Sequence, residues 1–269
     1  PYLMQLDIRP DGRQLATLIP GANDKIHIYD FERKTLTLLT NTPGNDSQPV
    51  WSPDGRQILY ANDREGNHDL YVIPADGSEP ARRILASPTD EFPVGWTPDG
   101  DHVLYTRVDQ AGKPDLWTVA VDGSEEPKAL FVSEYPNFNG RISPDGQLLA
   151  YSSDSSGQPD VYLRSLDGSG NPTRVSVEQC RDPRWRPDGR TLYFRTRDRM
   201  MAVSVEPGAD FEVGLPREAF ELDETVFGKL PMYPDGTRFL ANRANPELRK
   251  HFGIRVVFGW ADHLEALQP

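Results

Sequence analysis

Charged and aromatic side chains gather in short segments of the sequence that lie just before a repeated Pro-Asp-Gly triplet. The acidic members of this set are Asp46, Asp90 and Glu91. The basic members are Arg141, Arg181, Arg184 and Lys229, and the aromatic members are Phe92, Tyr135, Phe138 and Phe227. Arginine suits carboxylate and phosphate groups, and aromatic residues beside arginine are typical of protein interfaces. These residue types predict recognition of a protein, a peptide or a small anionic ligand.

Part of this set also has a simpler structural interpretation. Phe92 and Phe138 are of a size to fill the gaps between neighbouring sheets. Residues 180–200 hold seven arginines and three acids, a local charge of +4 in a chain whose formal net charge is −12. This stretch is either a patch for an anionic partner or an alternation of arginines along one side of a strand, partly paired with Asp198. We favour the alternation.

The motifs of common hydrolases and metalloenzymes are missing from the sequence. There is no G-x-S-x-G nucleophile elbow, no H-E-x-x-H motif and no paired Cys/His spacing for zinc. Loops of the form D-x-x-G-x-x-D at 63–69, 109–115 and 154–160 offer oxygen atoms to calcium, but they lack the full ligand number. Their aspartates are better explained as caps of their own turns. We therefore predict a non-catalytic protein without a cofactor or a metal.

The overall composition argues against several classes of function. Lys and Arg number 29 against 41 Asp and Glu, so the chain is a poor candidate for binding nucleic acid. No apolar run approaches the roughly 18 residues of a membrane-spanning helix, so no membrane insertion is expected. Cys180 is the single cysteine, which excludes an internal disulfide. The chain begins at Pro1 within a strand-like pattern, and we expect it to be a piece of a longer protein.

The elements that must position the candidate residues repeat along the chain. Pro-Asp-Gly occurs with spacings of 43, 45, 46, 43 and 47 residues, at Pro10, Pro53, Pro98, Pro144, Pro187 and Pro234. Such a period is the length of one four-stranded blade of a β-propeller. A large apolar residue two places before each proline marks the end of strand A, and runs such as 57–61, 69–73 and 82–86 follow as strands B, C and D. Six copies predict six blades.

The triplet is best explained as the turn between strands A and B. Proline presets φ for a type I turn, glycine supplies a positive φ, and Ser52, Thr97 and Ser143 can bond back to the turn backbone. Asp-Gly pairs at 76–77, 122–123 and 167–168 mark the turns between strands C and D. These hairpins share one face of a propeller. The candidate residues therefore belong to the D–A connections of the other face, where we expect a channel mouth with acids on one side and arginines on the other.

The combination of WSPDG, ILYANDREGNHDLYV and DGS resembles the TolB-like, or WD40-like, PD40 propeller repeats over nearly the whole chain. The ending IRVVFGWADHLEAL, residues 254–267, is similar to the end of PD40 propellers attached to bacterial serine/threonine kinases and related membrane sensors. The resemblance implies a periplasmic or other extracytoplasmic module for sensing or protein binding, with no catalytic residues to carry over. The alternatives are a propeller hydrolase or lyase with a site at the channel mouth, a structural spacer, or an accessory domain that gates a separate catalytic domain.

We therefore predict one all-β domain over residues 1–269, a monomeric six-bladed propeller that binds a protein or peptide partner. Blade 5 has a longer C–D connection within residues 205–220. The last blade is expected to be incomplete, with RVVFGW as its strand C, and to be followed by a short C-terminal helix at ADHLEAL.

Overall fold

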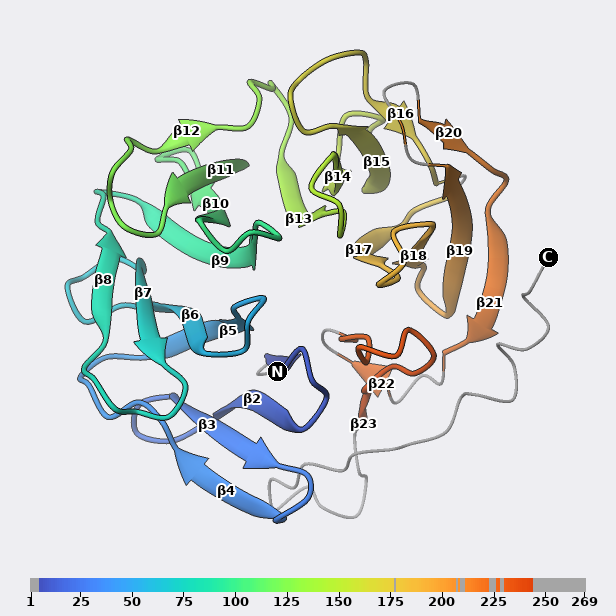
Figure 1. Cartoon of the computed structure of the whole chain (residues 1–269). Helices are drawn as coiled ribbons and strands as arrows, with labels where there is room; N and C mark the ends of the chain where they lie inside the picture. Colours follow the sequence, from blue (N-terminus) through green and yellow to red (C-terminus); the bar gives the residue numbers. More distant parts are fainter. Residues whose placement is uncertain are drawn as a thin grey trace.

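The computed structural model describes residues 5–176, 178–206, 208, 211–222, 226–227 and 230–243. Within them the chain is all-β, and the sheets are arranged around a common centre as a propeller (Figure 1). In each complete blade the strands follow one another as antiparallel neighbours, from strand A at the centre to strand D at the rim. The B strands are buried on both faces, as the continuous burial of strands such as 57–62 and 148–153 shows, because neighbouring blades cover them.

The strands of the five complete blades follow the predicted order. Blade 1 contains β1 (Leu6–Ile8), β2 (Gln14–Ile19), β3 (Lys25–Asp30) and β4 (Thr35–Leu38). Blade 2 contains β5 (Asp46–Trp51), β6 (Gln57–Asn62), β7 (Asp69–Pro74) and β8 (Arg82–Leu85). Blade 3 contains β9 (Asp90–Trp96), β10 (His102–Val108), β11 (Pro114–Ala120) and β12 (Lys128–Ala129). Blade 4 contains β13 (Asn137–Ile142), β14 (Leu148–Ser153), β15 (Asp160–Ser165) and β16 (Thr173–Arg174).

Blade 5 contains β17 (Arg181–Trp185), β18 (Thr191–Arg195) and β19 (Arg199–Glu206), followed by the outer strands β20 (Glu212–Val213) and β21 (Arg217–Glu221). Both outer strands pair with β19, at its two ends. The predicted long C–D connection is thus present, and β20 lies within it.

The described residues form five blades, not the six that the triplet count predicted. The sixth repeat contributes β22 (Val226–Phe227) and β23 (Asn242–Arg243), which form a two-stranded sheet, and an isolated bridge between Met232 and Phe239. A blade needs strands C and D as well, and the described part of this repeat ends at residue 243. The expected strand C, the C-terminal helix and the kinase-like ending at 254–267 all lie outside the described residues.

The Pro-Asp-Gly triplets form the A–B turns as predicted. In all six, the glycine N–H donates to the carbonyl of the residue before the proline at 2.8–2.9 Å. The six glycines have φ between 68° and 78°, a region that side chains disfavour. Ser52 Oγ donates to Asp54 Oδ1 at 2.6 Å and accepts the N–H of Gln57 at 2.9 Å, so the hydroxyl does bond back within the turn.

Tryptophans two places before the proline join blades 2, 3 and 5 to the blade that precedes each of them. The indole N–H of Trp51 donates to Asp7 O at 3.2 Å, that of Trp96 to Val50 O at 3.3 Å, and that of Trp185 to Arg141 O at 3.1 Å. The buried core is likewise divided into clusters that each span two neighbouring repeats, such as Ile26 with Tyr60 between blades 1 and 2. Packing between blades therefore holds the ring together.

The sixth repeat closes the ring between blades 5 and 1. Tyr233 and Leu240 pack with Leu6, Ile8 and Leu15 of blade 1 in one buried cluster. A Cβ placed on Gly12 would lie 3.6 Å from the ring of Pro234, so the first and last turns also touch. In the described part of the chain, no helix is long and apolar enough to cross a membrane.

Candidate functional site

The channel wall is built from the same few positions of every repeat. A cavity of about 270 Å³ at the centre is lined by strand A residues of the five blades and by their counterparts in the sixth repeat. The residue three places before the proline contributes in all six cases: Asp7, Val50, Gly95, Arg141, Arg184 and Pro231. Together these residues are termed the channel ring. Six equivalent backbone positions thus present an acid, two bases and three uncharged residues.

The charges of the channel ring are separated around its circumference. Asp7 belongs to the first repeat and Arg141 to the fourth, so they come from repeats on opposite sides of a sixfold ring, and Arg184 stands in the repeat after Arg141. Asp7 Oδ2 accepts the main-chain N–H of Trp51 at 2.9 Å, which joins blade 1 to blade 2. Asp7 is the acid of the channel ring, and the acids predicted for this side, Asp46, Asp90 and Glu91, do not line the cavity.

The two arginines bond mainly to carbonyl oxygens. Arg141 Nη1 donates to Val94 O at 2.5 Å and to Gly140 O at 2.7 Å, and Arg184 Nη1 donates to Pro183 O at 2.8 Å. Val94 belongs to blade 3, so Arg141 links two blades where Ile142 replaces the tryptophan found at that position in blades 2, 3 and 5. Within the described residues, neither guanidinium has a carboxylate within 4.0 Å.

Burial acts on both arginines. Burial first, and the charge of Arg184 second, lower the pKa of Arg141 to about 9, while Asp7 and Asp182 partly offset this. Burial lowers the pKa of Arg184 as well, and this residue is only 9% exposed. Arg141 still carries its charge at neutral pH. The cavity therefore holds two neighbouring cations that the protein does not neutralise at close range.

Above the channel ring, bulges turn polar residues into a second layer. The pairing of β5, β13 and β17 with their neighbours shifts register around Gln48, Asn139 and Asp182, whose φ values are 50°, 54° and 58°. All three lie five places before the proline of their repeat. Asn139 Nδ2 donates to Asp182 Oδ1 at 2.7 Å, and the N–H of Gln48 donates to Gln5 Oε1, so the layer bridges neighbouring repeats. Left-handed non-glycine residues are strained and often occur at functional sites.

The acidic candidates from the D–A connections anchor those connections. Asp46 is 1% exposed, and its carboxylate accepts bonds from Thr40 and, at 2.8 Å, from Asn62 Nδ2. Glu91 is fully buried and accepts bonds from Ser87 and from Thr89 Oγ1. Burial raises the pKa of both carboxyl groups.

Asp90 lies nearer the surface, where its carboxylate accepts the main-chain N–H of His68 at 2.9 Å. Asp46, Glu91 and Asp90 are absent from the cavity lining.

The remaining candidates are spread over the mouth. Arg181 is exposed, Tyr135 is 48% exposed and Phe138 is half-buried. Phe92 packs on His68 of blade 2 with ring centroids 4.8 Å apart, which fits the gap-filling interpretation. Phe227 lies in β22, but its side chain is outside the described residues, and so is Lys229.

Sequence reasoning missed part of the channel wall. Asp7, Gln5, Gln48, Asn139 and Asp182 were not among the candidates. The signal that could have found them is the alignment of the six triplets, because each of these five residues falls three or five places before a proline.

The calcium and zinc hypotheses gain no support. The described residues contain no group of three or more His, Cys, Asp or Glu arranged to hold a metal. In the loop at 109–115, Asp109 Oδ1 accepts the N–H groups of Ala111 and Lys113, both at 2.9 Å, so this aspartate caps its own turn.

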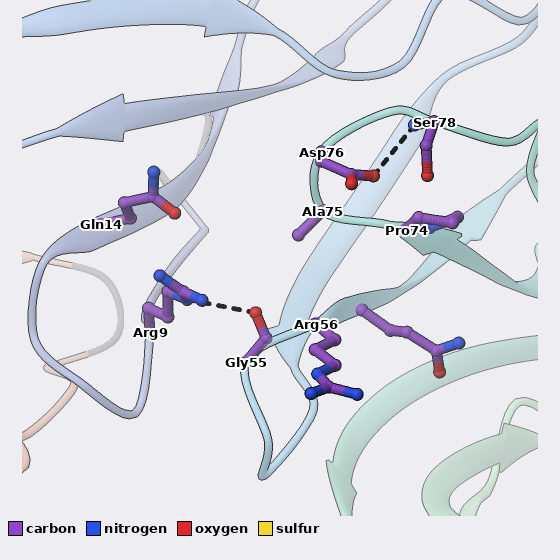
Figure 2. Close-up of a pocket in the computed structure, with 9 residues that line it drawn as sticks. Arg9, Gln14, Gly55, Arg56, Pro74, Ala75, Asp76 and Ser78 are labelled. Carbon is purple, nitrogen blue, oxygen red and sulfur yellow. Dashed lines mark hydrogen bonds between the residues drawn. The ribbon is translucent and has the colours of Figure 1, made fainter.

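A second cavity, of about 460 Å³, lies on the hairpin face between blades 1 and 2 (Figure 2). Its polar groups already bond to one another: Arg9 Nε donates to Gly55 O at 3.1 Å, and Asp76 Oδ1 accepts the N–H of Ser78 at 3.0 Å. Arg56 extends from the turn into solvent. Because these groups serve the turns, we assign no binding role to this cavity.

Comparison with known proteins agrees with this architecture. Residues 7–111 match the family model described as the TolB beta propeller domain, with PD40 repeats. The chain is a β-propeller that is similar to TolB propellers. Over 84 residues it is 30% identical to the Tol-Pal system protein TolB of Wolinella succinogenes, which covers 31% of this chain and 20% of that protein. Over 105 residues it is 33% identical to the "Uncharacterized peptidase YuxL" of Bacillus subtilis, covering 36% of this chain and 16% of that protein. The matches thus span a minor part of these relatives.

Solved structures share the fold of this chain at low sequence identity. TolB from Acinetobacter baumannii superposes with a TM-score of 0.62 and 23% identity, covering 82% of this chain and 56% of that one. A candidate TolB from Agrobacterium tumefaciens gives a TM-score of 0.68 and 20% identity, with 87% of each chain covered. An oligogalacturonate lyase in complex with manganese gives a TM-score of 0.63 and 18% identity, covering 90% of this chain and 71% of that one. Both TolB proteins and enzymes therefore share this fold, which does not determine the function.

Proposed function

We propose that this TolB-like propeller is a non-catalytic recognition domain that binds a protein or peptide partner at the channel mouth of the D–A face. The observation that carries the proposal is the channel ring, in which one position of the repeat carries five residue types in six repeats. A rigid scaffold with a variable wall is the usual arrangement for specific recognition.

The chemistry of the mouth favours a partner with an acidic segment. Arg181 and Tyr135 are exposed around the opening, and both residue types are common among the residues that dominate binding energy at interfaces. Deeper in the channel, Arg141 and Arg184 add two cations. This positive region stands out in a chain with a formal net charge of −12, so an acidic partner would be directed to the mouth.

We further propose that the domain acts outside the cytoplasm, in the periplasm, as the sensing part of a bacterial envelope protein. The similarity to TolB propellers supports this location. Fractionation of the cells that produce the protein, with an antibody against the domain, would test it. Recovery with cytoplasmic markers would contradict it.

Partner capture with matched variants tests the binding proposal. The domain serves as bait for an envelope extract, beside a variant in which Arg141, Arg181 and Arg184 are replaced by Ala. The control replaces Arg13, Arg56 and Arg190, three exposed arginines of the A–B turns on the opposite face, and so removes the same charge. A partner retained by the control and lost from the channel variant supports the proposal. Equal recovery by both variants would overturn it.

A second candidate function is an accessory domain of a peptidase. The 33% identity to the B. subtilis peptidase favours it, although only 16% of that protein is matched. Labelling the captured proteins with a serine-hydrolase probe separates the two functions. A labelled hydrolase held by the channel mouth would favour the accessory domain, and an unlabelled partner would favour the recognition domain.

A further inference from the structure

We propose that Arg141 and Arg184 form a binding site for a single carboxylate group inside the channel. The inference deepens the proposed function and rests on it only for the source of the carboxylate. That source is either an acidic residue of the partner or a small free acid, and both offer the same chemistry to the two guanidinium groups.

The environment of the two arginines differs from that of the buried ion pairs of the protein. Asp69 pairs with Arg83 at 2.7 Å and Asp160 pairs with Arg174 at 2.9 Å, and both carboxylates are buried. In blades 2 and 4, therefore, a buried acid is matched by an arginine. The channel has the reverse arrangement, in which the buried Arg184 and the half-buried Arg141 lack an acid at pairing distance among the described residues. Burying a charge without a partner costs free energy. An external anion that pairs with these guanidinium groups would recover part of this cost on binding.

The acid that faces the pair cannot neutralise both cations. Asp7 raises the pKa of Arg141 and of Arg184, so its field reaches them, but its Oδ2 is engaged by the N–H of Trp51. Asp182 acts on both in the same direction from the layer above, where its Oδ1 accepts a bond from Asn139. These two acids moderate the mutual repulsion of the arginines without bonding to them.

Donor groups remain for a ligand. A guanidinium carries five N–H donors, and the described bonds of Arg141 and Arg184 use only Nη1 of each. Two neighbouring guanidinium groups with free Nε and Nη2 donors match the two oxygens of a carboxylate, which accepts paired bonds from arginine. A neutral amide of the same shape lacks the charge and has only one acceptor oxygen.

The cavity sets the size of the ligand. About 270 Å³ admits one side chain or a small acid rather than a folded element. Apolar residues form much of the wall, including Leu6, Val94, Ile142 and Met232. The ligand we infer is therefore a carboxylate on a short apolar stem, such as a glutamate side chain.

Trp185 provides a reporter next to the site. It lines the cavity, and its indole N–H donates to Arg141 O. Nuclear magnetic resonance can follow this N–H while N-acetyl-glutamate α-amide is added. The matched neutral probe is N-acetyl-glutamine α-amide. We expect a saturable shift of the Trp185 signal with the first probe and none with the second.

Variants at two arginines complete the test. Arg184→Met keeps the length of the side chain and removes the charge, and we expect it to weaken the carboxylate probe at least tenfold. Arg184→Lys keeps the charge but lacks the planar guanidinium group. Its affinity for the carboxylate probe should lie between those of the unmodified protein and Arg184→Met. Arg56→Met, on the opposite face, should leave the affinity unchanged. Equal shifts with both probes, or an unchanged affinity in Arg184→Met, would overturn the inference.

The outcome is separable from that of the proposed function. If Arg184→Met still captures the partner and the titration shows no carboxylate preference, the carboxylate site is refuted while partner binding stands. If the titration succeeds but the triple channel variant captures the partner as well as its control does, the proposed function fails and the site stands. Where both succeed, the probe displaces the partner if the partner supplies the carboxylate, and both bind together if a free acid does.

Discussion

The two ends of strand A use the repeat in opposite ways. At the hairpin end, all six repeats keep Pro-Asp-Gly, the same turn bond and the same positive φ at glycine. Three places earlier, the same six repeats carry Asp, Val, Gly, Arg, Arg and Pro. Both sets occupy equivalent positions in one scaffold, only a few residues apart.

This difference separates residues that build the ring from residues that give it a function. The turns touch one another around the ring, since a Cβ on Gly146 would lie 3.7 Å from Pro98 and one on Gly189 would lie 3.7 Å from Pro144. A substitution in one of these turns therefore alters a contact between neighbouring turns that recurs around the ring. Within the described residues, the channel ring leaves two cations without a close acid, which costs stability and which we propose serves binding.

The largest effect on stability should come from the inter-blade tryptophans. Trp51 is 4% exposed and packs between blades 1 and 2. Trp51→Ala should lower the free energy of unfolding by about 3–5 kcal/mol, because it leaves a large cavity. Trp51→Phe, which mainly removes the bond to Asp7 O, should cost about 1 kcal/mol. Chemical denaturation measures both, and a small loss in Trp51→Ala would show that packing between blades is not what holds the ring.

The contact between turns should have the next largest effect. Gly55 has φ of 68°, and a Cβ there would lie 2.9 Å from Arg9 Nε, whereas Gly112 has φ of 82° and open space around it. Gly112→Ala should cost about 1–2 kcal/mol for the left-handed backbone alone. Gly55→Ala should cost more, because it also displaces Arg9 from Gly55 O. Equal losses in the two variants would mean that the contact between turns contributes nothing.

At the channel ring, we expect a substitution to raise the free energy of unfolding instead of lowering it. Arg184→Met replaces a buried charge by an apolar side chain of similar length and should raise the free energy of unfolding by about 1 kcal/mol. The control, Arg83→Met, should lower it because Asp69 loses its ion-pair partner in a buried position. Thermal unfolding of both variants at neutral pH measures this. Destabilisation by Arg184→Met would assign Arg184 to the scaffold instead of the binding wall.

The sequence predicted the scaffold well because turns are local. Proline and glycine restrict their own dihedral angles, so the six A–B turns and the order of strands follow from residue type and spacing. Six triplets predicted six blades where the described residues form five, since a triplet specifies a turn and not the strands C and D that must follow it. The sixth repeat shows this with its isolated bridge between Met232 and Phe239.

The wall was only partly predictable because it depends on which side of strand A faces inward. Bulges at Gln48, Asn139 and Asp182 shift that side by one residue, and the sequence alone does not mark a bulge whose left-handed residue is not glycine. Arg141 and Arg184 were found as arginines in the right segment. Asp46 and Glu91, chosen on the same grounds, are buried at the starts of β5 and β9.

The smallest effect should be a difference in pH dependence between the two ends of β5. Burial raises the pKa of Asp46, at the first residue of the strand, so the folded protein holds its proton more tightly and stability falls as pH rises through that window. Hydrogen bonds from Ser52 and Arg56 lower the pKa of Asp54, in the turn after the strand, so its contribution is present at higher pH and is lost as pH falls through the folded pKa. Asp46→Asn should therefore gain stability relative to the unmodified protein as pH rises above about 4. The relative loss in Asp54→Asn should instead grow as pH rises toward about 4 and shrink as pH falls below it, by less than about 1 kcal/mol because Asp54 is largely exposed. Denaturation series at several pH values measure both slopes. Slopes of the same sign would mean that Asp46 and Asp54 experience the same kind of electrostatic environment. This result would contradict the difference between the two ends of the strand.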